Sequence, residues 1–299
     1  MLTTSLELPV RRPFAADALL SFLRNHAVPG VEFVGGRTYG RALRLAGGDG
    51  IVSLTLPSDD DANEVPATVR LEDAADLQAA IAACRRLLDL GADPVAIDQL
   101  LASDPALAPS VAATPGLRVP GAVDGPETLI RTMLGQQVSV AGARTAAARL
   151  VHAAGQRLGI PHGELTNLFP TSGAIAALGP EVIAGPRRRA QAVIHTARAM
   201  AEGELIVTAE RPSAELTADL VARPGIGPWT AGYLAMRLGS DRDVLLTGDL
   251  VLRQGAILLG MPGAPRALAD RSTGWRPFRS YAGMHLWAVA LAQRTGRDR

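Results

Sequence analysis

Two short stretches of the chain carry residue types that could act together on a nucleic acid. One is a turn rich in proline and glycine, Arg223-Pro224-Gly225-Ile226-Gly227-Pro228-Trp229, and the other is an isolated carboxylate, Asp249. Glycines let main-chain amides approach a phosphate closely, and a helix that starts after the turn adds the positive end of its dipole. A carboxylate can stabilise positive charge that develops on a sugar. The pair predicts an enzyme that works on a base drawn out of the DNA duplex.

Each stretch also has an interpretation without chemistry. Two helices joined by a short turn form an ordinary helical hairpin, in which Gly225 and Gly227 supply positive φ angles and Pro224 fixes the entry. An Asp directly before an apolar helix is typically its N-cap, worth about 0.5–2 kcal/mol. Capping and catalysis are compatible for Asp249, because helix amides stabilise a carboxylate as an anion.

The aromatic residues are few, but their positions favour a pocket for a flat base. All three tryptophans, Trp229, Trp275 and Trp287, lie in the C-terminal quarter of the chain. Trp229 and Tyr233 are four positions apart and would share one face of a helix. Electron-rich rings attract a cationic base, at roughly 0.5–2 kcal/mol for each cation–π contact. The alternative is that the rings only fill a core, which is the interpretation we favour for Trp275.

Composition narrows the chemistry that the chain can perform. All 30 basic residues are Arg, so no Lys side chain can form a Schiff base with an opened sugar. The single cysteine, Cys84, is interpreted as a small buried apolar residue, since it cannot supply the four ligands of an iron–sulfur cluster. We expect no required cofactor. A net charge of +1 is low for a protein that coats nucleic acid, so local amides and a few arginines would have to hold DNA.

Hydropathy and the N-terminal sequence predict where the protein works. No apolar run approaches the ~20 residues of a transmembrane helix. Residues 1–7 lack the basic start and apolar stretch of a signal peptide. We therefore expect a cytoplasmic, nucleoid-associated monomer with no membrane contact and no obligate protein partner.

The pattern of apolar residues predicts two domains, residues 1–112 and residues 113–299. In the first, strands are expected over residues 5–10, 31–34, 42–45 and 51–56, and helices over 15–25 and 77–90. Asp59-Asp60-Asp61 is expected to be a solvated loop. From residue 113 the pattern becomes helical, and Asp124 and Glu127 have the spacing of a capping box. The predicted fold class is an α+β domain followed by an all-α domain, mainly α overall.

Four blocks of sequence, in order, resemble the helix–hairpin–helix DNA glycosylases, and within them the DNA-3-methyladenine glycosylase II (AlkA) type. They are Leu134-Gly135-Gln136-Gln137-Val138-Ser139, then Pro224-Gly225-Ile226-Gly227-Pro228-Trp229-Thr230-Ala231, then Asp249, then Pro277-Phe278-Arg279-Ser280-Tyr281-Ala282. Val31-Glu32 and Tyr39-Gly40-Arg41 also fall in family-like positions, so the likeness covers nearly the whole chain. It implies an AlkA-like N-terminal domain and a helix–hairpin–helix glycosylase domain.

The resemblance implies roles for individual residues. Asp249 would be the catalytic carboxylate, and the base pocket would be lined by Trp229, Tyr233 and Trp287. DNA would be bound by Gly225, Ile226, Gly227, Thr230 and Gln137. Gln137 stands where the family places a wedge side chain that fills the gap left by the flipped base, and the best-known relatives have an apolar residue there. Main-chain carbonyls of Val221, Arg223 and Ile226 would bind a structural Na⁺ or K⁺.

Two absences imply that the enzyme is hydrolytic and monofunctional. Members of the superfamily with lyase activity carry a Lys just after the hairpin, where this chain has Trp229. The iron–sulfur members carry four cysteines near the C-terminus. A further departure is Leu250, because a Tyr can follow the catalytic Asp in relatives.

The expected activity is hydrolysis of the N-glycosidic bond of alkylated purines, of the 3-methyladenine and 7-methylguanine type, in double-stranded DNA. Base flipping would expose the bond, and the product would be an abasic site. Alkylation at a ring nitrogen makes the base cationic and a good leaving group, so one carboxylate could suffice. Two alternatives stay open: a non-enzymatic helix–hairpin–helix DNA-binding module, and a glycosylase for oxidised or deaminated bases.

Overall fold

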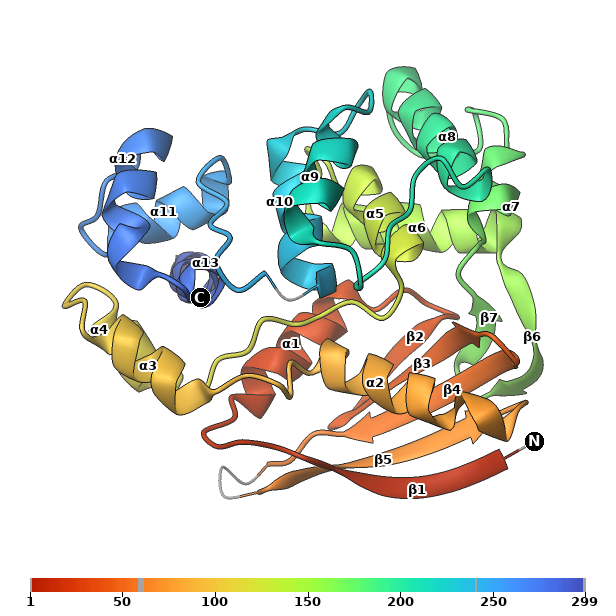
Figure 1. The fold of residues 1–299 in the computed structure, drawn as a ribbon, viewed down its shortest axis with the longest axis horizontal. Coiled ribbons are helices and arrows are strands. Elements are labelled where there is room, and N and C mark those ends of the chain that lie inside the picture. Colours follow the sequence, from red (N-terminus) through yellow and green to blue (C-terminus); the bar gives the residue numbers. More distant parts are fainter. Residues whose placement is uncertain (1, 59–61, 240, 298–299) are drawn as a thin grey trace.

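A five-stranded antiparallel sheet forms the first part of the chain (Figure 1). The computed structural model describes residues 2–58, 62–239 and 241–297, and the expected loop at 59–61 lies outside them. The strands follow the order β1-β5-β4-β3-β2. Their bounds are β1 (Leu2–Pro9), β2 (Glu32–Gly35), β3 (Thr38–Leu45), β4 (Gly48–Thr55) and β5 (Glu64–Leu71).

Strand β5 was not predicted, and its proline explains why. A central strand pairs with a neighbouring strand on each side, and Pro66 has no N–H with which to take part in this pairing. In the sheet it lies opposite Glu7 of β1, while the β4–β5 pairing extends only from Gly50–Leu71 to Leu54–Ala67. Pro66 therefore lies just beyond the ladder with β4, where its missing N–H disrupts no pairing on that side.

Two helices, α1 (Ala16–His26) and α2 (Leu77–Leu87), pack on one face of this sheet. Leu19 and Leu23 of α1 and Cys84 of α2 join the strands in one apolar core. Cys84 is 2% exposed, and burial raises the pKa of its thiol to about 12. The prediction that Cys84 is a small buried residue is confirmed.

The remainder of the chain is mainly helical, so the predicted fold class is confirmed. None of the helices in the described residues is long and apolar enough to cross a membrane. The helices are α3 (Pro94–Ala102), α4 (Ala108–Ala113), α5 (Gly125–Leu134), α6 (Val140–Ala154), α7 (Ser172–Ala176), α8 (Arg187–Ala201), α9 (Ser213–Val221), α10 (Pro228–Leu234), α11 (Leu250–Leu258), α12 (Pro265–Arg271) and α13 (Arg279–Arg297).

A short hairpin, β6 (Gln156–His162) and β7 (Leu165–Leu168), interrupts the helical region and was not predicted. Leu158 and Leu165 of this hairpin form a small apolar cluster with Ala42 and Ile51 of the N-terminal sheet. Strands β6 and β7 pair with each other, and they lie beside the N-terminal sheet, which is far away in sequence (Figure 1).

The helices enclose two further cores. One is built mainly by α5, α6, α8, α9 and α10. The other combines α11 and α13 with α3, which contributes Ile97 and Leu101, and with α4, which contributes Val111 and its N-cap residue Leu107. Helices α3 and α4 therefore precede the expected boundary at residue 112 but pack with helices that follow it. The division of the chain at residue 112 stays a prediction.

Helix α5 begins with the expected cap, but Glu127 in its first turn has partners that were not predicted. Asp124 accepts a hydrogen bond from the main-chain N–H of Glu127 at 2.6 Å, as a capping box requires. The carboxylate of Glu127 does not return to Asp124. Instead it pairs with Arg41 at 2.8 Å and with Arg131 at 2.7 Å.

These pairs belong to a buried charge network that joins the N-terminal sheet to α5. Glu32 pairs with Arg131 at 2.9 Å and accepts a hydrogen bond from the Tyr39 hydroxyl at 2.6 Å. Burial by itself would raise the pKa of the Glu32 carboxyl, but Arg131, Arg41 and the hydrogen bonds together hold that pKa below its usual value. The network contains two carboxylates and two guanidinium groups, so its charges balance.

His285 predicts a pH dependence of stability. Its side chain is 1% exposed, its Nε2 has no partner among the described residues, and burial lowers its pKa to about 4. Between pH 6.5 and 4 the unfolded chain therefore binds a proton that the folded chain does not. We expect the free energy of unfolding to fall as pH falls through this window, by about 1 kcal/mol per pH unit from this residue.

Urea unfolding between pH 7 and 4.5 measures this dependence, with His285→Gln as the comparison. The slope should be shallower in the variant. Equal slopes in the two proteins would contradict a neutral, buried His285.

Candidate functional site

Asp249 holds its carboxylate at the N-terminus of α11, with three donors around it. Its Oδ1 accepts the main-chain N–H of Leu252 at 2.8 Å, so the side chain is the N-cap of the helix. The indole N–H of Trp229 donates to Oδ2 at 2.9 Å, and that of Trp287 donates to Oδ1 at 3.1 Å. The structure thus makes Asp249 a cap and also the meeting point of two predicted pocket residues.

The rings of the predicted base pocket lie together. Trp229 and Tyr233 are stacked, with centroids 5.3 Å apart and planes inclined by 9°. Both rings and that of Trp287 are only partly buried and pack against the core of α11 and α13. Tyr233 also contacts the other helical core, so the aromatic group lies where the two cores meet. Partly exposed faces of large rings are the surfaces that a flat ligand could contact.

The α9–α10 turn has the expected hairpin form, with one correction. Gly225 has φ +85°, and a Cβ built there would lie 2.6 Å from the Cβ of Ala192. The prediction that Gly227 also has a positive φ is wrong: its φ is −97°. Gly227 is extended because it immediately precedes Pro228, the first residue of α10, and a residue before proline favours extended backbone. Apart from Gly227 and its two chain neighbours, no atom of the described residues lies within 4 Å of a Cβ built at Gly227.

Gln136 ties the hairpin to the loop between α5 and α6, a role that was not predicted. Its Nε2 donates to the carbonyl of Gly225 at 2.9 Å and to the hydroxyl of Thr230 at 3.1 Å. Thr230 is 2% exposed. The buried hydroxyl of Thr230 therefore holds the turn in place, and its expected contact with DNA stays a prediction.

Gln137, the residue expected at the wedge position, is exposed on the same loop. Its φ is +58°, a value that non-glycine residues seldom adopt, so the loop projects its side chain from a tight turn. The two neighbouring glutamines therefore differ: Gln136 anchors the hairpin, and Gln137 faces solvent. The wedge role of Gln137 stays a prediction.

The expected cation site lies at the end of α9. Val221 is the last residue of this helix, where carbonyl groups lack helical partners. The carbonyl of Arg223 accepts the N–H of Ile226 at 3.2 Å. Carbonyl oxygens are suitable ligands for a hard cation, so these residues fit the expected Na⁺ or K⁺, which stays a prediction.

Arg237 and Phe22 extend the aromatic group, and neither was predicted. The guanidinium carbon of Arg237 lies 5.3 Å from the centroid of Tyr233 and 4.8 Å from that of Phe22, which comes from α1. Arg237 could have been found from its spacing, four residues after Tyr233. Phe22 carries no such signal, because only the fold brings α1 to this position.

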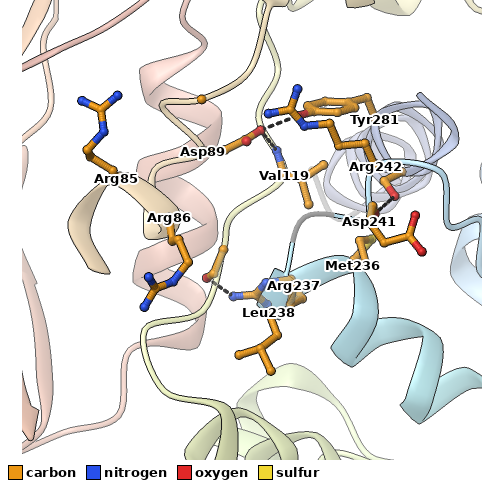
Figure 2. Close-up of a pocket in the computed structure, with 13 residues that line it drawn as sticks. Arg85, Arg86, Asp89, Val119, Met236, Arg237, Leu238, Asp241, Arg242 and Tyr281 are labelled. Atoms are coloured by element: carbon orange, nitrogen blue, oxygen red, sulfur yellow. Dashed lines mark hydrogen bonds between the residues drawn. The ribbon is translucent and has the colours of Figure 1, made fainter. Parts of the chain in front are cut away.

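A cavity of about 250 Å³ lies behind Arg237, between the end of α2 and the start of α13 (Figure 2). Its lining includes Arg86, Asp89, Arg237, Arg242 and Tyr281. The lining does not include Asp249 or the three pocket rings. The cavity is therefore separate from the carboxylate and touches the aromatic group only through Arg237.

Trp275 has a structural role, as predicted. It is 1% exposed and donates its indole N–H to Asp104 at 2.7 Å. Its ring belongs to the core of α11 and α13.

Comparisons with known proteins give a matching family model and similar sequences. A family model described as the AlkA N-terminal domain matches residues 5–124. The chain is 36% identical to DNA-3-methyladenine glycosylase 2 of Escherichia coli, over 92% of this chain and 94% of that protein. It is also 44% identical to a probable bifunctional transcriptional activator/DNA repair enzyme AlkA of Mycobacterium tuberculosis, over 96% of this chain but 57% of that protein. The chain thus spans little more than half the length of this relative.

Among solved structures, a 3-methyladenine DNA-glycosylase from Archaeoglobus fulgidus is similar over 99% of both chains, with a TM-score of 0.79 and 20% identity. At this identity the likeness shows the fold alone. Taken with the match to the E. coli enzyme over nearly its full length, these findings show that the chain belongs to the DNA-3-methyladenine glycosylase 2 (AlkA) family.

Proposed function

We propose that this protein releases alkylated purines from double-stranded DNA by hydrolysing the N-glycosidic bond. The observation that carries the proposal is the Asp249 carboxylate, held by the indole N–H groups of Trp229 and Trp287 beside the stacked ring of Tyr233. A carboxylate fixed next to partly exposed aromatic rings suits a reaction in which a flat cationic base leaves a sugar that becomes positively charged.

In this mechanism the damaged nucleotide rotates out of the duplex, and the base enters the aromatic pocket. The bond between C1′ and the base nitrogen breaks, and its electron pair stays on the base. Asp249 stabilises the positive charge that appears on the sugar. Water adds to C1′ and loses a proton, which leaves an abasic site. No acid need protonate the leaving base, because alkylation has already made it cationic.

The hairpin would hold the DNA backbone while this happens. Gly225, Gly227 and the first residue of α10, Pro228, lie in one short turn, and partial positive charges of its amides would bind one phosphate. Gln136 fixes this turn relative to the loop that carries Gln137. Phosphate binding and base flipping would then be parts of one rigid surface.

We propose further that the enzyme is monofunctional. A lyase of this superfamily joins a Lys amine to the opened sugar, and the chain contains no Lys. The abasic strand should therefore stay intact until alkali cleaves it.

The test is base release from methylated duplex DNA, followed by analysis of the strand with and without alkali. Release of 3-methyladenine and 7-methylguanine, with breaks only after alkali, supports the proposal. Tight DNA binding without release would favour the non-enzymatic module. Release of oxidised or deaminated bases alone would favour the other alternative.

The two hairpin glycines should respond differently to alanine. Gly225→Ala places a Cβ at φ +85° against Ala192, so we expect a loss of about 1–2 kcal/mol of stability together with weaker DNA binding. Gly227→Ala meets no atom and needs no unusual φ, so its stability should stay within about 0.5 kcal/mol of wild type. Its methyl group would nevertheless keep a phosphate away from the amide.

Thermal unfolding and fluorescence anisotropy with duplex DNA separate these effects. Gly227→Ala should bind DNA more weakly with an unchanged melting temperature. If it binds DNA as wild type does, the amide of Gly227 does not approach a phosphate.

A further inference from the structure

Asp249, Trp229, Tyr233 and Arg237 form a continuous column with opposite charges at its ends. The Asp249 carboxylate accepts the Trp229 indole N–H at 2.9 Å, Trp229 stacks on Tyr233 at 5.3 Å, and Arg237 lies 5.3 Å from the Tyr233 centroid. Trp229, Tyr233 and Arg237 are each four residues apart. The π-helical turn Ala235–Gly239 follows α10 and carries Arg237 in this column.

The position of Arg237 is fixed on three sides. Its Nη1 donates to the Tyr233 hydroxyl at 2.5 Å, its Nη2 donates to the Gly121 carbonyl at 3.0 Å, and its guanidinium faces the ring of Phe22. Figure 2 shows the bond to the carbonyl and the cavity beside it. A side chain held by two hydrogen bonds and a ring keeps its charge in one place.

The charge of Arg237 is not neutralised by a neighbour. Within residues 2–58, 62–239 and 241–297, no carboxylate lies within 4.0 Å of its guanidinium. His26 stacks on Phe22 at 4.0 Å, but burial, together with the charges of Arg237 and Arg131, lowers its pKa to about 4. His26 is therefore neutral at pH 7, while Arg131 is balanced by Glu32 and Glu127. Asp89 and Asp241 line the neighbouring cavity, but within the described part of the chain neither forms an ion pair with Arg237.

We propose that Arg237 is a positioning residue that sets both the rate and the charge preference of base release, acting through Tyr233. This inference rests on the proposed glycosylase activity. As the glycosidic bond breaks, an electron pair moves from the sugar to the base. The base side becomes more negative and the sugar side more positive. A fixed cation behind the base pocket and a fixed anion beside the sugar therefore both favour this movement.

The charge of Arg237, which favours bond breaking, has the opposite effect on the binding of a cationic base. A base that is already positive is repelled by Arg237, and the Tyr233 ring attracts it less strongly because Arg237 withdraws electron density from it. A neutral base in the pocket is not repelled. Arg237 would thus weaken the binding of cationic bases while it speeds their release, which is the pattern of ground-state destabilisation.

Arg237→Gln tests the proposal, because Gln removes the charge but keeps a hydrogen-bond donor. In single-turnover assays with a duplex that carries one 7-methylguanine, we expect the rate constant for release to fall about tenfold. Binding is measured with the Asp249→Asn change added to both proteins, which should slow release enough for equilibrium binding to be measured. The quantity compared is the affinity for the 7-methylguanine duplex divided by the affinity for a duplex with neutral hypoxanthine. Arg237→Gln should raise this ratio by roughly threefold or more.

Three further variants separate charge from packing. Arg237→Lys keeps the charge and should keep the binding ratio of wild type. Tyr233→Phe removes the hydroxyl that holds Arg237 and should shift the ratio in the same direction as Arg237→Gln. Arg242→Gln removes another cation that lines the cavity, and it should leave rate and ratio unchanged. Thermal unfolding of each variant confirms that it is folded.

The proposal is overturned if Arg237→Gln weakens the binding of both duplexes equally, or if the ratio stays at the wild-type value. Either result would make Arg237 a purely structural support for Tyr233. If the wild-type protein releases no methylated base at all, the proposed function fails instead, and the binding ratio still reports on Arg237 independently.

Discussion

Asp249→Asn should lower the rate of base release by about 10²–10³-fold or more, since a fixed charge beside the reacting sugar would be lost. The fold should survive, because Asn is as good an N-cap as Asp. A modest loss of about 1–2 kcal/mol is expected: the carboxylate receives Trp229 at one oxygen and Trp287 at the other, and the amide group of Asn cannot accept from both. Single-turnover release of 7-methylguanine and urea unfolding measure the two effects.

Asp93→Asn is the matched control for this result. Asp93 caps α3 by accepting the N–H of Ala96 at 3.1 Å, but it is exposed and has no part in the aromatic pocket. Its variant should release bases at the wild-type rate. Undiminished release by Asp249→Asn would show that Asp249 is a helix cap and nothing more, and the proposed mechanism would have to be abandoned.

The second large effect is expected on stability, at the buried charge network. Arg41→Met would leave Glu32 and Glu127 facing Arg131 alone, with one negative charge uncompensated in the interior. Removing one partner of a buried ion pair costs about 3–5 kcal/mol. Because whole domains are stable by only about 5–15 kcal/mol, the melting temperature should fall strongly. The deficit should shrink as pH is lowered, since protonation of a carboxyl group restores the charge balance.

Two comparisons identify the cause. The double variant Arg41→Met, Glu127→Leu removes one charge of each sign and should recover part of the lost stability, because paired buried charges can be exchanged for apolar groups at little cost. Arg211→Met breaks an exposed pair with Asp219 and should cost about 1 kcal/mol or less. An Arg41→Met protein as stable as wild type would contradict the uncompensated charge.

The sequence predicted those parts of the fold that depend on local pattern. Helices with a clear apolar face, such as α2, and the cap at Asp124 need only residues close together in the chain. Strand β5 and the β6–β7 hairpin could not be predicted from local sequence, because Pro66 and the Gly-Ile-Pro segment of β6 are poor strand formers. Their pairing is favoured by distant apolar partners, which local patterns do not reveal.

The candidate site shows the same limit. The motif spacing and the resemblance placed Asp249, Trp229, Tyr233 and Trp287 in one site, and the structure brings them together. The φ of Gly227 was wrong because its neighbour Pro228, and not the turn, decides its backbone. The spacing of Arg237 from Tyr233 could have placed it beside the aromatic group, but the absence of an ion-pair partner can be recognised only when the neighbouring carboxylates are placed.

Each part of the molecule contributes a segment to the core of the other part, and this has a consequence for how the chain folds. Residues 94–113 complete the core of α11 and α13, while the hairpin at 156–168 completes the outer face of the N-terminal sheet. A fragment that begins at residue 113 would expose apolar side chains that Ile97 and Leu101 normally cover, and a fragment that ends there would leave Ile51 uncovered. Neither part can reach its final state before the other has formed. During synthesis the sheet, which ends at Leu71, must therefore wait for the hairpin that ends at Leu168, and the two parts should melt as one cooperative unit.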